Sequence, residues 1–250
     1  MKLITTLIIL YCISIATPIT AQAKYITKGT ISYEYKVNNH KNFANDDGED
    51  NFWSAQMIEN TPKVSTYYYD LKFNNNQSVY NYTSKVESAK KMWGEDELED
   101  NIWYTNYTAN STVIQKSIFG DLFLLQDSIK KLQWKLLPGE TREFANFTCK
   151  KAMTKLYDSV YVFAFYTENI ILNGGPMQFN GLPGTILAIT IPRLNVSCVA
   201  TAYNPMVKDA DILIPKKGKN KQQKDVYTKI KEVTKDWGKY GQKAIWMSFL

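Results

Sequence analysis

Few side chains of this 250-residue chain have the types and spacing that catalysis requires. The chain contains one histidine, His40, so a Ser-His-Asp or Cys-His arrangement would have to use that residue. His40 lies in a polar stretch, where a solvated ring is the simpler interpretation, and a histidine-based zinc site would need several nitrogen or sulfur ligands. The sequence therefore predicts no histidine-based catalysis, no metal and no cofactor.

Carboxylates are the remaining groups that could perform acid–base or metal chemistry. The cluster of Asp46, Asp47, Glu49 and Asp50 could hold a hard cation, but its spacing does not match the calcium loop of a helix-loop-helix motif. No two acids are singled out as a pair facing one cleft, as a glycosidase would need. Glu168 lies just before a glycine-rich loop, and it keeps a carboxylate-dependent envelope hydrolase open as an alternative function.

The segment with the most unusual composition is residues 174–184, called the Gly/Pro segment below. It brings Gly-Gly-Pro, Asn-Gly and Pro-Gly together and is followed by the apolar run 185–191. Residues 182–185 fit a type II turn, in which a proline occupies the second position and Gly184 the third, where φ is positive. The backbone therefore shapes this segment, which carries no evident catalytic side chain.

We expect the Gly/Pro segment to recognise another molecule without transforming it. An apolar ligand, or an extended part of another envelope protein such as an outer-membrane receptor, suits a shaped loop beside aromatic side chains. A third alternative is a structural component of an outer-membrane assembly, which would dock through the lysine-rich C-terminal part. The residues expected to form the binding surface are Trp134, Tyr166, Phe179, Gly181, Leu182, Pro183 and Gly184.

The N-terminus has the features of a secretory signal peptide. Lys2 provides a positive start, residues 3–16 are mostly apolar, Pro18 ends that run, and the tripeptide 21–23 offers small residues for cleavage. The apolar run is too short to span a bilayer, and no later stretch reaches the necessary length. We therefore expect residues 1–23 to be removed and the mature protein to be soluble, in the periplasm or associated with the outer membrane. Nucleic acid is not an expected partner there.

Two cysteines remain after signal removal, Cys149 and Cys198, and both lie in predicted strands. In an oxidising compartment they could form a disulfide that closes a loop of about fifty residues and stabilises the fold by about 4 kcal/mol. The alternative is two buried thiols, which are common in protein cores. The sequence leaves both alternatives open.

Most of the mature chain reads as short strands with alternating apolar and polar residues. Residues 29–37 and 64–73 are typical, and the 17 tyrosines, 11 phenylalanines and 6 tryptophans suit pleated surfaces. About ten such strands predict a mainly β fold, a curved antiparallel sheet that is half-barrel or sandwich-like. This domain is expected to span residues 24–207, with a polar loop at residues 38–62.

The C-terminal part, residues 208–250, is predicted to be a lysine-rich linker followed by one amphipathic helix. Residues 208–243 carry eleven lysines against five acids, which is typical of a solvated helix face or of a surface for acidic partners. Gly238 is placed to end the helix. The apolar stripe that the helix would pack on the sheet consists of Val226, Ile230, Val233 and Trp237.

A series of short elements follows one order between residues 134 and 187. The elements are Trp134-Lys135, Cys149-Lys150-Lys151-Ala152, Phe165-Tyr166-Thr167-Glu168-Asn169-Ile170, Gly175-Pro176, Phe179-Asn180-Gly181 and Gly181-Leu182-Pro183-Gly184-Thr185-Ile186. Together they resemble the GLPGLI family, a group of exported proteins of the Bacteroidetes without an assigned function. Thr185 stands where the family has a leucine, and Phe165 where a tryptophan is usual. The resemblance implies an envelope location and a β-rich fold, but no catalytic residues.

Overall fold

The computed structural model of the chain describes residues 25–44, 52–90, 95–157, 159–248 and 250. The predicted signal peptide, residues 1–23, and the acidic cluster, residues 46–50, lie outside these ranges. The strands are β1 (Gly29–Asn38), β2 (Val64–Phe73), β3 (Gln77–Lys85), β4 (Ile102–Asn106), β5 (Ser111–Ile118), β6 (Asp121–Ser128), β7 (Lys135–Phe144), β8 (Phe147–Leu156), β9 (Val160–Thr167), β10 (Thr185–Ile191), β11 (Val196–Asn204) and β12 (Lys219–Lys221). The helices are α2 (Asn39–Phe43), α3 (Phe52–Asn60), α4 (Gln223–Val233) and α5 (Gly238–Ser248), with the 3-10 turns η1 (Glu95–Leu98), η2 (Pro192–Leu194) and η3 (Asp209–Asp211).

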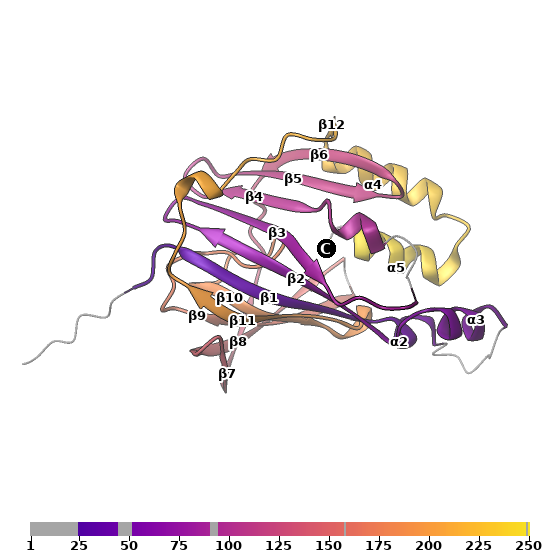
Figure 1. Cartoon of the computed structure of the whole chain (residues 1–250), viewed down its shortest axis with the longest axis horizontal. Helices are drawn as coiled ribbons and strands as arrows, with labels where there is room; N and C mark the ends of the chain where they lie inside the picture. The colour runs from indigo at the N-terminus through magenta and orange to yellow at the C-terminus, as the bar shows by residue number, and fades with distance from the viewer. Residues whose placement is uncertain (1–24, 45–51, 91–94, 158, 249) are drawn as a thin grey trace, which may run out of the picture.

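The strands form one continuous sheet in the order β12-β6-β5-β4-β3-β2-β1-β11-β10-β9-β8-β7. Neighbouring strands are antiparallel, except that β12 runs parallel to β6. Figure 1 shows the sheet curling so that β5 and β6 lie opposite β8 and β9, while the edge strands β12 and β7 do not meet. This confirms the predicted mainly β fold. A single curved sheet also selects the half-barrel over the sandwich.

Side-chain alternation explains which face of the sheet packs against the core. In β1, residues 31, 33, 35 and 37 are buried, whereas the residues between them are only half-buried, as expected for a strand with one face against the core. The inward residues of this strand are Ile31, Tyr33, Tyr35 and Val37. Aromatic side chains are thus concentrated on the inner face, where they supply much of the buried apolar area that stabilises the fold.

One difference from the prediction concerns residues 38–62, which were expected to be a polar loop. They contain the short helices α2 and α3. Asn38 caps α2, because its side chain accepts a hydrogen bond from the backbone N–H of Lys41. Helix α2 has only five residues, and the apolar residues of α3 are spread around the helix, so neither has the continuous apolar stripe from which a helix is predicted.

The predicted C-terminal helix is also corrected. Helix α4 ends at Val233, and Gly238 begins a second helix, α5, instead of ending the first. Val226 and Ile230 are buried as predicted, but Val233 is 46% exposed. The chain turns at this point because Gly238 adopts a φ of 55°, which glycine tolerates.

The C-terminal part packs on the same core as the sheet, through residues that include Val226 and Ile230 of α4 and Ile245 and Trp246 of α5. The segment boundary between residues 207 and 208 stays a prediction. None of the helices in the described ranges is long and apolar enough to cross a bilayer.

The structure has Cys149 and Cys198 as free, buried thiols rather than as a disulfide. Cys149 lies in β8 and Cys198 in β11, and two further strands, β9 and β10, separate them in the sheet. Three steps of about 4.8 Å place the two backbones about 14 Å apart, which is beyond the roughly 7 Å that a disulfide spans. Burial raises the pKa of each thiol to about 12, so both stay protonated.

Candidate functional site

Four aromatic rings from consecutive strands form a continuous surface on the inner face of the sheet, called the aromatic floor below. Tyr35 of β1 meets Tyr69 of β2 at 6.0 Å between ring centroids, and Tyr69 stacks on Tyr80 of β3 at 4.9 Å. Tyr80 in turn lies 5.4 Å from Trp103 of β4. All four side chains are more than nine-tenths buried, so packing holds the floor in one arrangement.

The aromatic floor forms one side of a pocket with a volume of about 190 Å³. The other walls come from η1, from β5 and from α5, which lies at the right in Figure 1. The Gly/Pro segment contributes one wall residue, Met177, which is buried and adopts a positive φ of 56°. Since such a φ is uncommon for a residue with a side chain, the segment is constrained where it meets the pocket.

The pocket contains one buried cation, Lys116 of β5. Alternation along β5 places Lys116 on the same inner face as Ile114 and Ile118, and it is only 5% exposed. Its Nζ lies 5.1 Å from the ring centroid of Trp103, in a cation–π contact at one end of the floor. Among the described residues, no ion pair or hydrogen bond of this ammonium group is found.

Burial lowers the pKa of Lys116 from 10.5 to about 8, because removing the ammonium group from water disfavours its charged form. Glu97 of η1, which also lines the pocket, opposes this shift by its negative charge. The Glu97 carboxylate is itself engaged, since its Oε1 accepts a hydrogen bond of 2.7 Å from the backbone N–H of Gly120. At pH 7 Lys116 therefore remains mostly protonated without a bonded counter-ion.

A second polar group in the pocket has no hydrogen-bond partner within the described ranges, the hydroxyl of Tyr35. The hydroxyl of Tyr69, in contrast, donates to the carbonyl of Leu98 over 3.3 Å, and that of Tyr80 lies 3.5 Å from the Cys198 Sγ. Buried polar groups in native proteins are normally paired. The pocket thus has an unpartnered donor at each end of its aromatic floor.

The residues that were predicted to bind a ligand lie in or near the Gly/Pro segment. Most of their side chains, however, are buried in the core. Trp134 is joined to the segment directly, because its indole Nε1 donates to the carbonyl of Asn180 over 2.8 Å. Tyr166, Phe179 and Leu182 are 2%, 3% and 2% exposed and belong to the main core cluster. Their packing role is evident from this burial, whereas a binding role for these side chains stays a prediction.

Two of the remaining predicted residues, Gly181 and Pro183, border a second pocket, with a volume of about 370 Å³. Gly181 and Pro183 are exposed there, beside the backbone of the segment. Gly184 has the positive φ that was predicted, 138°, although the hydrogen bond of the turn runs from Gly184 N to the Leu182 carbonyl around Pro183. The turn is therefore a three-residue γ-like turn, tighter than the predicted type II turn.

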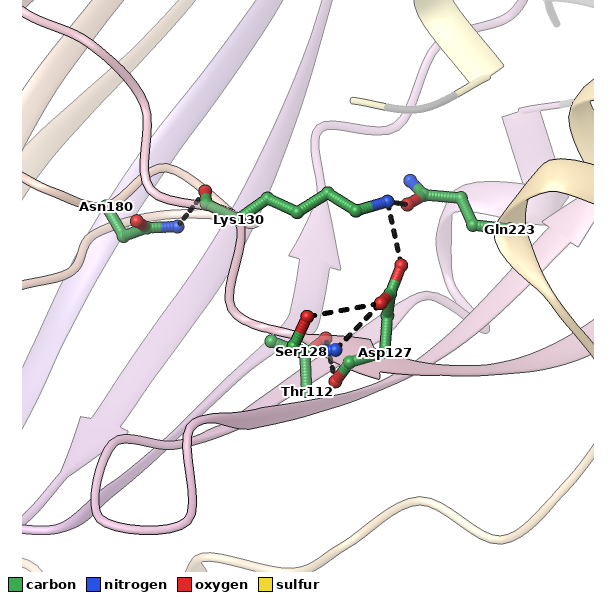
Figure 2. Close-up of polar contacts among 6 residues, drawn as sticks. All are labelled: Thr112, Asp127, Ser128, Lys130, Asn180 and Gln223. Carbon is green, nitrogen blue, oxygen red and sulfur yellow. Dashed lines mark hydrogen bonds and ion pairs between the residues drawn. The ribbon is translucent and has the colours of Figure 1, made fainter.

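A chain of polar contacts links the Gly/Pro segment to the end of β6 and the start of α4 (Figure 2). Asn180 donates from its Nδ2 to the carbonyl of Lys130 over 3.2 Å. The Lys130 Nζ then lies 2.7 Å from the Asp127 Oδ2 and donates to the Gln223 Oε1 of α4 over 2.8 Å. These contacts join the segment, the end of β6 and the start of α4. Hydrogen bonds and an ion pair therefore connect the elements that lie at the open side of the half-barrel.

The groups that could have supported catalysis lie elsewhere. Glu168 forms an ion pair of 2.8 Å with Lys150, and the two side chains are 48% and 58% exposed. His40 lies on α2, with its Nε2 3.2 Å from the carbonyl of Thr61. Neither residue lines the aromatic pocket, and the described residues contain no cluster of acids, cysteines and histidine with metal-ligand spacing.

Sequence reasoning missed Lys116, the charged residue of the pocket. One signal could have found it, since period-2 alternation in the sequence Thr112-Val113-Ile114-Gln115-Lys116-Ser117-Ile118 puts the lysine on the isoleucine face. The floor residues Tyr35, Tyr69, Tyr80 and Trp103 were foreseen only as members of aromatic strands. Their meeting depends on strand order, which alternation does not reveal.

Comparisons with known proteins leave the function open. No protein-family model matches the sequence, and no curated protein matches it. Among solved structures, PNGF-II is similar over 89% of this chain, with 14% identity and a TM-score of 0.49, and the chain spans 33% of the length of PNGF-II. An uncharacterized conserved protein of Thermus thermophilus is similar over 79% of this chain and 91% of its own, with 6% identity and a TM-score of 0.40. Neither likeness carries an argument about function, and the resemblance to the GLPGLI family stays a prediction.

Proposed function

We propose that this chain is an exported envelope protein that binds a small apolar ligand in the pocket over the aromatic floor and does not transform it. The observation that carries the proposal is the floor itself, four buried rings that end at a buried and unpaired ammonium group. A mostly apolar, preformed pocket with a few polar groups is the usual form of a small-molecule site.

The size of the pocket limits the ligand. An apolar cavity of about 150 Å³ holds a benzene molecule. The volume here is about 190 Å³, so a ligand with one aromatic ring or a short alkyl chain fits. In this proposal the Gly/Pro segment acts indirectly, because it closes the open side of the half-barrel and supplies Met177 to the wall.

The proposal is tested by calorimetric titration of the purified protein with one-ring and short-chain compounds. A larger side chain on α5 provides the decisive variant. Ala244 lines the pocket, so Ala244→Phe should fill it and weaken binding by about tenfold or more. Gln242, on the same helix, is exposed and lies outside the pocket, so Gln242→Phe is the matched control and should bind as the wild type does.

Two results would contradict the proposal. One is a wild-type protein that binds no compound of the panel. The other is equal binding by Ala244→Phe and the wild type, which would place the ligand elsewhere on the protein. The pocket beside Gly181 and Pro183 would then be the next site to examine.

A further inference from the structure

The ammonium group of Lys116 is energetically unusual. Lysine is rarely buried without a partner, because an isolated charge loses its hydration in the protein interior. The cation–π contact with Trp103 compensates for part of that loss, but the structure provides no bonded anion among its described residues. A group that accepts a charge-assisted hydrogen bond would complete the site.

The other groups around the pocket do not fill this role. Glu97 provides the side-chain carboxylate in the pocket wall, and it is held by the Gly120 N–H. Leu250, the last residue of the sequence, also lines the pocket, but no ion pair joins it to Lys116 among the described residues. Asn101 accepts a hydrogen bond from the backbone N–H of Ser117 with its Oδ1, 2.9 Å away. Apart from the uncharged hydroxyls of its tyrosines, Ser117 and Ser248, the remaining lining is aromatic or aliphatic.

The arrangement also fixes where an anion would lie relative to an apolar group. Lys116 lies over the ring of Trp103, and the rings of Tyr80 and Tyr69 lie beside Trp103 at 5.4 and 6.4 Å between ring centroids. A ligand with a negative group at Lys116 would therefore extend its apolar part along the floor. Its length is limited by the volume of about 190 Å³.

We propose that the ligand of this pocket is a small organic acid, whose carboxylate pairs with Lys116 while its single ring or short alkyl chain lies on the aromatic floor. This inference rests on the proposed function, because it names the ligand class of the same pocket. An arylacetate or a short fatty acid has this chemistry. The carboxylate accepts the hydrogen bonds that Lys116 cannot make within the described protein.

The test compares acids with neutral compounds of nearly the same shape on the wild-type protein. Phenylacetate is paired with phenylacetamide, and hexanoate with hexanamide, at pH 7 by calorimetric titration. We expect the better-binding acid to exceed its amide by about tenfold or more in affinity. Lys116→Met should lower the affinity for the acid to the level of the amide. Lys155, exposed on β8 and outside the pocket, gives the control Lys155→Met, which should keep the preference.

The outcomes separate this inference from the proposed function. If the wild type binds the amide as tightly as the acid, the ligand class is wrong while the apolar pocket stands. Retention of the acid preference by Lys116→Met would equally overturn the role of this lysine. If neither member of either pair binds, the proposed function itself fails. The comparison on the wild-type protein needs no variant, so it decides the question even if Lys116→Met folds poorly.

Discussion

Lys116 is a charged residue at a strand position that the fold buries. A strand position that alternates with isoleucines would normally hold an apolar side chain, which would pack on Trp103 without losing hydration. Residues that break such rules without evident structural gain are concentrated at functional sites. The burial of this lysine therefore supports the proposed acid ligand.

Replacement of Lys116 by methionine should stabilise the protein. Methionine has a similar length and no charge to desolvate, so we expect the free energy of unfolding at pH 7 to rise by roughly 1–3 kcal/mol. Urea denaturation checks this value, and Lys155→Met, on an exposed position of β8, should change stability little.

The difference in stability between Lys116→Met and the wild type should depend on pH, and the pKa of Lys116 determines the sign of that dependence. The pKa of Lys116 is about 8 in the folded protein and 10.5 in its ordinary state, so the unfolded chain binds more protons between these values. The penalty of the buried ammonium group is fully present below pH 8 and disappears above pH 10.5. The stability difference between Lys116→Met and the wild type should shrink across this window, and a difference that does not vary with pH would contradict the assignment.

The cysteines give a second prediction at the scale of single residues. Burial and a pKa of about 12 make both thiols unreactive in the folded state. Alkylation with iodoacetamide at pH 8 should modify neither Cys149 nor Cys198 before unfolding and both after it, as read by intact mass. A protein that gains no label when unfolded without reductant would instead contain a disulfide.

At the scale of elements, the Gly/Pro segment owes its path to glycines that no other residue replaces. Gly184 directly precedes β10, and a Cβ added to it would lie 2.1 Å from the carbonyl oxygen of Thr167 at the end of β9. That backbone cannot move without shifting the sheet. The segment therefore positions Met177 in the pocket and Trp134 against Asn180 by backbone geometry.

Gly184→Ala should destabilise the protein by roughly 2–4 kcal/mol, because it combines backbone strain with this clash. Gly139 is a matched control, since it also has a positive φ, 94°, but nothing lies within 4 Å of its added Cβ. Gly139→Ala should therefore cost only about 1 kcal/mol. Thermal or urea unfolding measures both, and equal losses would show that the clash at Gly184 is relieved.

Elements were predicted well where one face is buried and alternation is strong. The bounds 64–73 of β2 match the prediction, and the alternating residues of β1 are the buried ones. Prediction failed where tertiary contacts override local patterns. Trp237 was predicted to belong to the apolar stripe of the helix. It lies instead in the bend between α4 and α5, where its ring packs on that of Phe119 with 5.6 Å between the ring centroids.

The candidate site was predicted only in part, for a physical reason. The Gly/Pro segment was recognised because its glycines and prolines are visible in the sequence. The pocket was not, because it requires β1 to β5 to be neighbours and η1 and α5 to close over them. These side chains come from five different strands, so no spacing pattern in the sequence reveals that they meet.

At the scale of the whole molecule, the fold is a half-barrel whose sheet shares one hydrophobic core with the Gly/Pro segment, α4 and α5. We propose that the protein is exported to the cell envelope. The N-terminal residue of the mature protein tests this proposal. After expression in its own cell, the protein in the envelope fraction should begin at Gln22 or Lys24, as read by intact mass. A chain that starts at Met1 in the cytosolic fraction would contradict export.

In the proposed complex, a small acid lies on the aromatic floor with its carboxylate at Lys116. A crystal structure of the wild-type protein with the tightest-binding acid of the panel tests this most directly. We predict the apolar group over Trp103 and Tyr80, with a carboxylate oxygen within hydrogen-bond distance of the Lys116 Nζ. A ligand bound outside this pocket, or one whose carboxylate points away from Lys116, would contradict the account.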